Sequence, residues 1–132
     1  MSIPVDLNDL VRALGDYGPG YLLSTTEGQV KVVTVEPEAD GGVLRIVGPG
    51  GGSCRNVAAN PIVTLVFPPA RPRGYSLIVD GSAAVADDDV LVTATAAVLH
   101  RPAAHADGEP VGDGCGHDCR PVGRGEARST AN

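Results

Sequence analysis

The sequence contains few aromatic residues and few cysteines. Tryptophan is absent, and one Phe and three Tyr bring the aromatic fraction to only 3% of the 132 residues. A hydrophobic core must therefore consist of aliphatic side chains, and we expect valine to dominate it. Three cysteines are an odd number and do not make a disulfide framework, which favours a reducing compartment.

Long apolar runs and a signal-like N-terminus are also missing. No stretch approaches the ~18 apolar residues that a membrane-spanning helix requires. The first ten residues, MSIPVDLNDL, lack the basic start and the apolar segment of a secretory signal. We therefore expect a cytoplasmic protein with no membrane partner.

Basic residues are outnumbered by acidic ones. The chain has ten Lys and Arg residues and 16 Asp and Glu residues, which gives a formal net charge of −6. This balance argues against nucleic acid or an anionic membrane as a partner. Lys31 is the single lysine among the basic residues, which we interpret as compositional bias rather than a binding patch.

The composition changes near Pro102. The length suits one domain, and apolar patterning runs through residues 1–101. Residues 102–132 are rich in Gly, Ala, Pro, Asp and Arg and show no hydrophobic periodicity. We therefore predict a folded domain over 1–101 and a mobile tail over 102–132.

One N-terminal helix is predicted over Asp6–Tyr17. Apolar residues recur there at helical spacing: Leu7, Leu10, Val11 and Leu14. Asp6 can cap the N-terminus, and the Gly-Pro-Gly run at 18–20 ends the helix.

Strand-like segments fill most of the remaining domain. Six of them are rich in Val, Ile and Leu: Tyr21–Thr26, Gln29–Val35, Val43–Val47, Ile62–Phe67, Tyr75–Val85 and Val90–Leu99. Glu27-Gly28 indicates a tight hairpin, and Gly81 indicates a bulge. Short connections predict antiparallel pairing between sequence neighbours, and six such strands close most easily into a small barrel. The fold class is therefore mainly β, a six-stranded antiparallel barrel with one N-terminal helix and one short internal helix.

The internal helix follows a glycine-rich loop. In the segment GPGGGSCRNVAANPIVTLVF, Ser53 can cap a short helix over Cys54–Ala59, and Arg55 adds a cation in its first turn. The glycines at 50–52 let backbone approach a ligand closely. The functional interpretation is a phosphate cradle, and the alternative is a flexible connection capped by Ser53.

Three pieces in this order resemble the flavin-binding split-barrel family, which is pyridoxamine-5′-phosphate-oxidase-like. They are the hairpin LLSTTEGQVKVVTV, the loop-helix-strand SCRNVAANPIVTLVF and the strand-turn YSLIVDGSAAVADDD. The resemblance implies a split β-barrel that forms a homodimer, with a flavin in the groove between subunits. It implies the following cofactor-binding residues: Val33, Thr34, Val35, Val47 and Gly48 for the ring, and Ser53, Arg55 and Asn56 for the phosphate.

The sequence departs from the family pattern at Ser53. Family members commonly carry a Lys three residues before the Asn that corresponds to Asn56. Loss of one charge-assisted phosphate contact costs about 1.5–3 kcal/mol, which is about ten- to a hundredfold in affinity.

The resemblance implies an oxidoreductase that uses FMN or a deazaflavin coenzyme and transfers a hydride to a small-molecule substrate. No sequence motif indicates a general acid or base, which is compatible with chemistry supplied by a cofactor. The alternative is a non-catalytic carrier of flavin, haem or another tetrapyrrole on the same fold.

A second chemical cluster lies in the tail. Cys115, His117 and Cys119 can chelate a metal such as zinc, form a redox pair or be incidental. A metal-sensing or redox-responsive protein is therefore a third hypothesis. Cys54, beside Arg55, is interpreted as a small packed residue or a reactive thiol, and Tyr21 and Tyr75 as packing or pocket residues.

Overall fold

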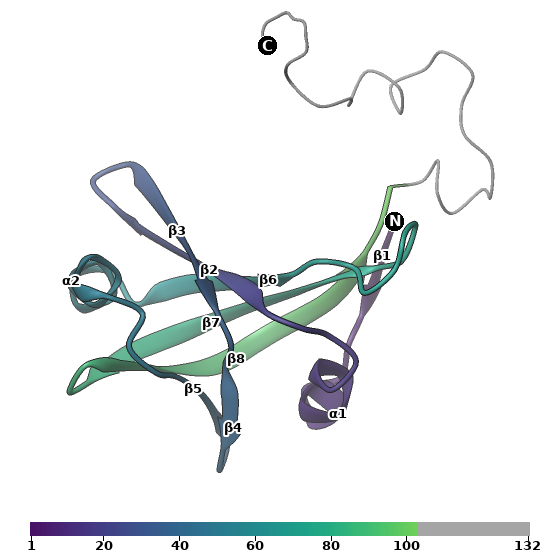
Figure 1. Cartoon of the computed structure of the whole chain (residues 1–132), viewed down its shortest axis with the longest axis horizontal. Helices are drawn as coiled ribbons and strands as arrows, with labels where there is room; N and C mark the ends of the chain where they lie inside the picture. Colours follow the sequence, from purple (N-terminus) through teal and green to yellow (C-terminus); the bar gives the residue numbers. More distant parts are fainter. Residues whose placement is uncertain (103–132) are drawn as a thin grey trace, which may run out of the picture. The chain divides into compact units, whose positions relative to one another are not determined.

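The computed structural model describes residues 1–102 of the chain, and Ser2–Arg101 form one compact unit. This unit is built from one antiparallel sheet and two short helices (Figure 1). The predicted metal ligands Cys115, His117 and Cys119 lie outside the described residues. No helix within residues 1–102 has the length and apolar character needed to cross a bilayer.

All six predicted strands are present, and two further strands of three residues each accompany them. The strands are β1 (Ser2–Pro4), β2 (Gly20–Thr26), β3 (Gln29–Val35), β4 (Glu38–Asp40), β5 (Val43–Ile46), β6 (Ile62–Phe67), β7 (Ser76–Ala86) and β8 (Asp89–His100). The prediction missed β1 and β4 because three residues are too few to show a period of two.

Every strand pair is antiparallel, as predicted, but the sheet does not close. Its order is β3-β2-β6-β7-β8-β5-β4, with β1 paired to β8, so β3 and β4 are its two ends. The expectation that the strands close and remove their edges is therefore wrong, whereas the split β-barrel implied by the resemblance is consistent with this open sheet. Pairing with sequence neighbours holds only in part, because β2 pairs with β6 and β5 with β8. A helix separates β5 from β6, so these two strands do not form a hairpin. β6 instead pairs with the edge of β2 opposite to β3.

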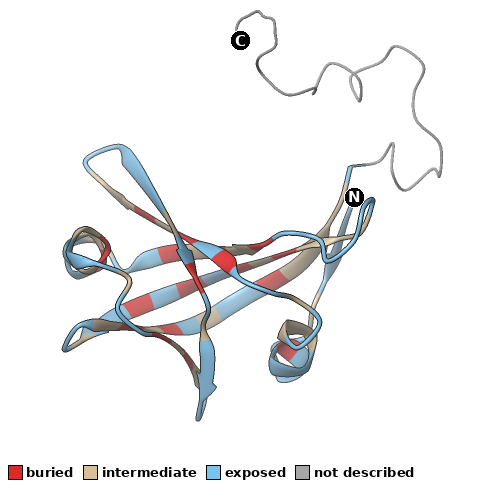
Figure 2. Cartoon of the chain, viewed as in Figure 1, coloured by how far each residue is buried: buried red, intermediate tan, exposed pale blue. Residues whose placement is uncertain are grey.

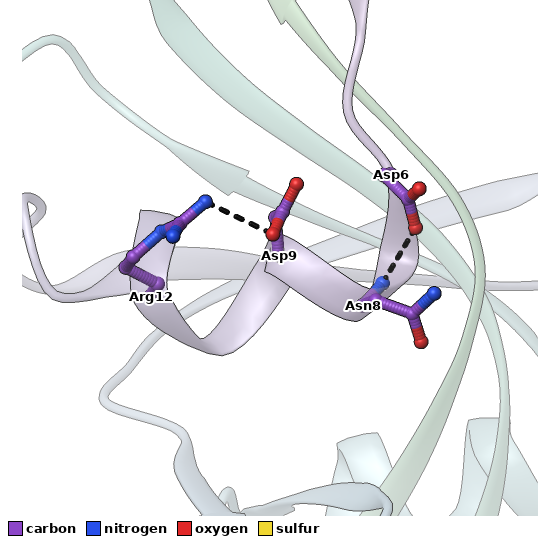
Figure 3. Close-up of polar contacts among 4 residues, drawn as sticks. All are labelled: Asp6, Asn8, Asp9 and Arg12. Carbon is purple, nitrogen blue, oxygen red and sulfur yellow. Dashed lines mark hydrogen bonds and ion pairs between the residues drawn. The ribbon is translucent and has the colours of Figure 1, made fainter.

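The N-terminal helix is shorter than predicted. It consists of a 3-10 turn, η1 (Leu7–Asp9), continued by α1 (Leu10–Leu14). Figure 3 shows that the Asp6 carboxylate accepts a hydrogen bond from the Asn8 N–H at 2.9 Å, which confirms Asp6 as the N-cap. An exposed ion pair between Arg12 and Asp9, also 2.9 Å, spans the junction. The helix stops at Leu14 because the next N–H groups bond three residues back, forming turns before Gly18 is reached.

Valine and leucine dominate the core, as expected from the shortage of aromatics. Figure 2 shows buried positions along the central strands β2, β6, β7 and β8. The single phenylalanine, Phe67, is buried at the end of β6, and its ring centroid lies 6.4 Å from that of Tyr17. Gly20 makes room for this ring, since a Cβ atom there would lie 2.5 Å from Phe67 Cδ1.

Two local features of the strands match the sequence. Glu27 and Gly28 both have positive φ (51° and 77°), the geometry of a two-residue hairpin turn between β2 and β3. The register between β7 and β8 shifts at Asp80 and Gly81, which confirms the predicted bulge. A Cβ atom at Gly81 would lie 2.7 Å from the Thr93 carbonyl oxygen, so the strands can approach there only because the residue is glycine.

We predict that Gly81→Ala lowers the free energy of unfolding by about 1–3 kcal/mol, because the added methyl group forces β7 and β8 apart. Chemical denaturation measures the change. Gly42→Ala is the matched control, since a Cβ atom at Gly42 has no neighbour within 4 Å. Equal stability of the two variants would contradict the close approach at the bulge.

Candidate functional site

The internal helix begins earlier than predicted. It is α2 (Gly51–Ala59), and its N-cap is Gly50, whose φ of 106° is a conformation that other residues rarely adopt. The Cys54 N–H donates to the Gly50 carbonyl oxygen at 3.1 Å and closes the first turn. Ser53 as N-cap is therefore wrong. The glycines that were interpreted as a loop form the first turn, where the N–H groups of residues 51–53 have no partner within the helix.

Asn56 fixes α2 against the inner face of β2. Its amide nitrogen donates to Ser24 Oγ at 3.2 Å, and its amide oxygen accepts from Thr26 Oγ1 at 3.1 Å. Ser24 is fully buried, so this contact satisfies a hydroxyl that water does not reach. Asn60 repeats the pattern one turn later by donating to Thr25 Oγ1 at 3.0 Å. The Asn56 side chain is thus used to position the helix.

Lys31 lies over the first turn of α2. A Cβ atom on Gly52 would be 2.9 Å from Cε and 3.2 Å from Nζ of Lys31. Lys31 was not predicted as a site residue, because the single lysine was interpreted as compositional bias. The hairpin register carried the signal: Lys31 pairs with Ser24, so its side chain leaves β3 on the face where α2 packs.

Arg55 brings a second cation to the same turn. Its side chain is exposed, and its guanidinium folds back so that a Cβ atom on Gly51 would lie 3.2 Å from Nη1. The first turn of α2 contains no acidic residue. Neither Lys31 nor Arg55 forms an ion pair within residues 1–102. Two cations at a helix N-terminus repel each other and the partial positive charge of that helix end. An anion bound there would offset this repulsion.

A groove of about 340 Å³ opens next to this turn. It lies where the ends of β3 and β5 meet the loop into α2, and its lining is Thr34, Val35, Glu36, Glu38, Val47, Gly48 and Pro49. The Gly48 N–H donates to Asp89 Oδ1 at 3.0 Å, and Asp89 Oδ2 lies 3.6 Å from Arg45 Nε. Asp89 therefore holds the loop that joins the groove to α2.

The structure brings together most of the residues that the resemblance implies. Four of the predicted ring-binding residues line the groove: Thr34, Val35, Val47 and Gly48. Val33 instead packs against the core. Arg55 lies at the start of α2 and is exposed, whereas the Ser53 side chain is fully buried and its hydroxyl has no hydrogen-bond partner among the described residues. Ser53 can thus face a ligand only through its backbone N–H.

The remaining candidate residues lie away from the groove. Tyr75 lines a separate cavity of about 480 Å³ with Tyr17, whose hydroxyl donates to the Tyr75 carbonyl oxygen at 3.0 Å. Burial, and to a lesser extent the nearby Asp16 carboxylate, raises the pKa of Tyr17. Tyr21 is partly exposed on β2, and Cys54 is half-buried with Sγ 3.7 Å from the Asp88 carbonyl oxygen. Residues 1–102 contain no cluster of His, Cys, Asp and Glu that could hold a metal.

We predict that Asn56→Ala lowers the free energy of unfolding by about 1–3 kcal/mol, because it leaves the buried Ser24 hydroxyl unpaired. Ser53→Ala is the matched control on the same helix. It removes an oxygen that forms no hydrogen bond within the described residues, so stability should stay constant or rise slightly. Thermal unfolding of the two variants measures the difference, and a larger loss in the Ser53 variant would show that the buried hydroxyl has a partner.

Comparison with known proteins identifies close relatives by sequence. No family model matches the chain. The proteins "Uncharacterized protein Mb0449c" of Mycobacterium bovis and "Uncharacterized protein MT0457" of Mycobacterium tuberculosis are each 42% identical to it over 132 aligned positions. The alignments cover 87% of this chain and 92% of each relative.

Solved structures resemble the chain at lower identity. An FAD-binding protein from Mesorhizobium loti has a TM-score of 0.58 at 15% identity, covering 76% of this chain and 99% of that protein. The FAD-binding protein of Mycobacterium smegmatis gives 0.57 at 17%, covering 76% and 100%. A candidate pyridoxamine 5′-phosphate oxidase from Listeria innocua gives 0.54 at 15%, covering 68% and 92%. The chain therefore belongs to the family of the two mycobacterial relatives, and its fold is that of the flavin-binding split barrels.

Proposed function

We propose that this protein is an oxidoreductase that binds a flavin, or alternatively a deazaflavin coenzyme, and transfers a hydride to a small-molecule substrate. The observation that carries the proposal is the pair of cations, Lys31 and Arg55, at the glycine-rich start of α2. The fold supports it, because two of the structural neighbours are named as FAD-binding proteins.

The first turn of α2 fits a phosphate group. The N–H groups of residues 51–53 point out of the helix start, and Lys31 and Arg55 flank them. Lys31 reaches this turn from β3 and supplies the charge that is missing at Ser53. The phosphate of FMN, the pyrophosphate of FAD and the phosphate of a deazaflavin coenzyme all present anionic oxygens that suit such a turn. Of these cofactors we propose FMN first, with a deazaflavin coenzyme as the alternative.

The neighbouring groove fits the ring system. Thr34, Val35, Val47 and Gly48 offer backbone and small side chains to a flat ligand, and Pro49 and Gly50 connect the groove to the phosphate turn. A bound flavin would supply the hydride chemistry. The chain itself would hold the phosphate through Lys31 and Arg55, keep the loop rigid through Asp89 and shield one side of the ring from water.

We predict that Lys31→Gln weakens FMN binding by about ten- to a hundredfold, because one charge-assisted contact to the phosphate is lost. Fluorescence titration of the purified protein with FMN measures the dissociation constant. Riboflavin lacks the phosphate, so its affinity should not change in the variant. Arg12→Gln removes an exposed cation on α1 that pairs with Asp9 and does not line the groove, so it should leave both affinities unchanged.

The same titration tests the proposal as a whole. Failure of the wild-type protein to bind FMN, FAD or a deazaflavin coenzyme would refute it, and equal losses for FMN and riboflavin in the Lys31 variant would refute the phosphate assignment. A carrier on the same fold would bind the cofactor without turnover. Repeated reoxidation of reduced cofactor by an added acceptor therefore separates the enzyme from the carrier.

We also propose that the protein forms a homodimer through the outer face of β3, β2 and β6. Apolar side chains are exposed on this face: Val30 by 60%, Val32 by 54%, Tyr21 by 40% and Ile62 by 65%. Several large apolar side chains exposed on one sheet face, here called the patch, are typical of a surface that contacts another protein. Thr34 pairs with Tyr21, so it lies on this face and also lines the groove. A second copy on the patch would therefore cover one side of the groove.

We predict that Val32→Glu converts the dimer into a folded monomer, because it buries a charge in the centre of the patch. Light scattering coupled to size-exclusion chromatography measures the mass. Val11→Glu is the control, since Val11 has an exposure (60%) close to that of Val32 (54%) but lies on α1. A wild-type protein that is monomeric, or a Val32 variant that remains dimeric, would contradict the assigned surface.

A further inference from the structure

The groove has an acidic lining at the end away from α2. Glu36 and Glu38, on either side of Pro37, both line it, and both side chains are exposed. Neither forms an ion pair within residues 1–102. No lysine, arginine or histidine is among the lining residues.

Arg45 offsets only part of the negative charge of this lining. Arg45 pairs with Glu38 in the β4–β5 ladder, but its guanidinium lies 3.6 Å from Asp89. With all four side chains ionised, Glu36, Glu38, Arg45 and Asp89 leave two negative charges at this end of the groove. The other lining residues, Thr34, Val35, Val47, Gly48 and Pro49, have uncharged side chains.

The carboxylates lie too far from the phosphate-binding cations for the two sets of charges to cancel. Lys31 and Glu36 are five positions apart on one extended segment, which is about 16 Å at the rise of a β-strand. Charge interactions in solution are screened over about 8 Å at physiological ionic strength. A molecule at the Glu36 end therefore experiences the charge of the carboxylates more strongly than the charge of Lys31.

We propose that Glu36 and Glu38 determine the substrate class, so that the cofactor reacts with cationic or neutral molecules and discriminates against anionic ones. This inference rests on the proposed function, because it concerns the substrate side of the same groove. A phosphate-bearing substrate, such as the one in the name of the Listeria innocua neighbour, would be repelled by this lining. At one end of the groove the cations bind the cofactor's phosphate. At the other end the carboxylates of Glu36 and Glu38 attract the substrate.

The carboxylates also affect the bound cofactor itself. Negative charge near the ring opposes the added negative charge of the reduced form. Removing Glu36 and Glu38 should therefore shift the reduction potential of bound flavin to a more positive value. This shift is measured at equilibrium and does not depend on any substrate.

The experiment uses two outer-sphere electron acceptors of opposite charge. The protein is loaded with FMN and reduced with dithionite. It is then mixed in a stopped-flow instrument with the trication hexaammineruthenium(III) or the trianion ferricyanide. Each acceptor ion takes one electron, so two ions reoxidise one reduced flavin, and the flavin's protons pass to the buffer. The measured quantity is the ratio of the two second-order rate constants, at low and at high salt.

The double variant Glu36→Gln/Glu38→Gln should reduce the preference for the cationic acceptor by at least about tenfold at low salt, and high salt should abolish most of the difference. Its flavin potential should rise. The control variant Asp16→Asn/Glu27→Gln changes the net charge equally but alters no groove residue, so both readouts should stay near the wild-type values.

The outcomes distinguish the two proposals. Failure of the wild-type protein to bind FMN, FAD or a deazaflavin coenzyme overturns the proposed function and this inference with it. FMN binding together with an unchanged acceptor ratio and potential in the Glu36/Glu38 variant overturns the inference and leaves the proposed function standing. Equal changes in the control variant would assign the effect to net charge, which also overturns it.

Discussion

The hydrogen bonds between Asn56 and the β2 hydroxyls hold α2 on the sheet, and the arrangement of the anion site depends on them. A nine-residue helix with an N-terminal glycine turn has little stability of its own. Its orientation comes from Asn56 and from Val57, which is buried in the core. With α2 fixed in this way, the unpaired N–H groups of its first turn point to a constant place beside β3, where Lys31 reaches them.

The positions of the charged residues say more about ligand binding than the net charge of the chain does. The chain carries a net charge of −6, yet Lys31 and Arg55 meet at one helix start without a carboxylate in that turn. Such an arrangement is unfavourable by itself, because the cations repel each other and the helix dipole. An anion at the first turn of a helix offsets such repulsion, because the unpaired N–H groups and the helix dipole favour negative charge there.

Local patterns in the sequence were sufficient for much of the fold but not for the site. Alternation and turn residues predicted six strands, the Glu27-Gly28 turn and the bulge at Gly81, because these depend on neighbours in sequence. Closure of the barrel was predicted wrongly, since pairing of β2 with β6 depends on contacts that no local pattern encodes. Ser53 was misassigned because a capping residue and a buried helical serine look alike in sequence. Lys31 was missed because its partner, Gly52, lies 21 positions away and is recognised only once β3 and α2 are placed together.

The length of the two-residue turn between β2 and β3 determines whether Lys31 can reach the first turn of α2. β3 is an end strand, held by β2 alone, and its side chains alternate between the two faces of the sheet. Slippage by one residue would turn Lys31 to the outer face and carry its apolar neighbours inward. The Glu27-Gly28 turn therefore sets which residue type faces α2. An insertion of one residue in this turn would erase a binding site without altering any residue that forms it.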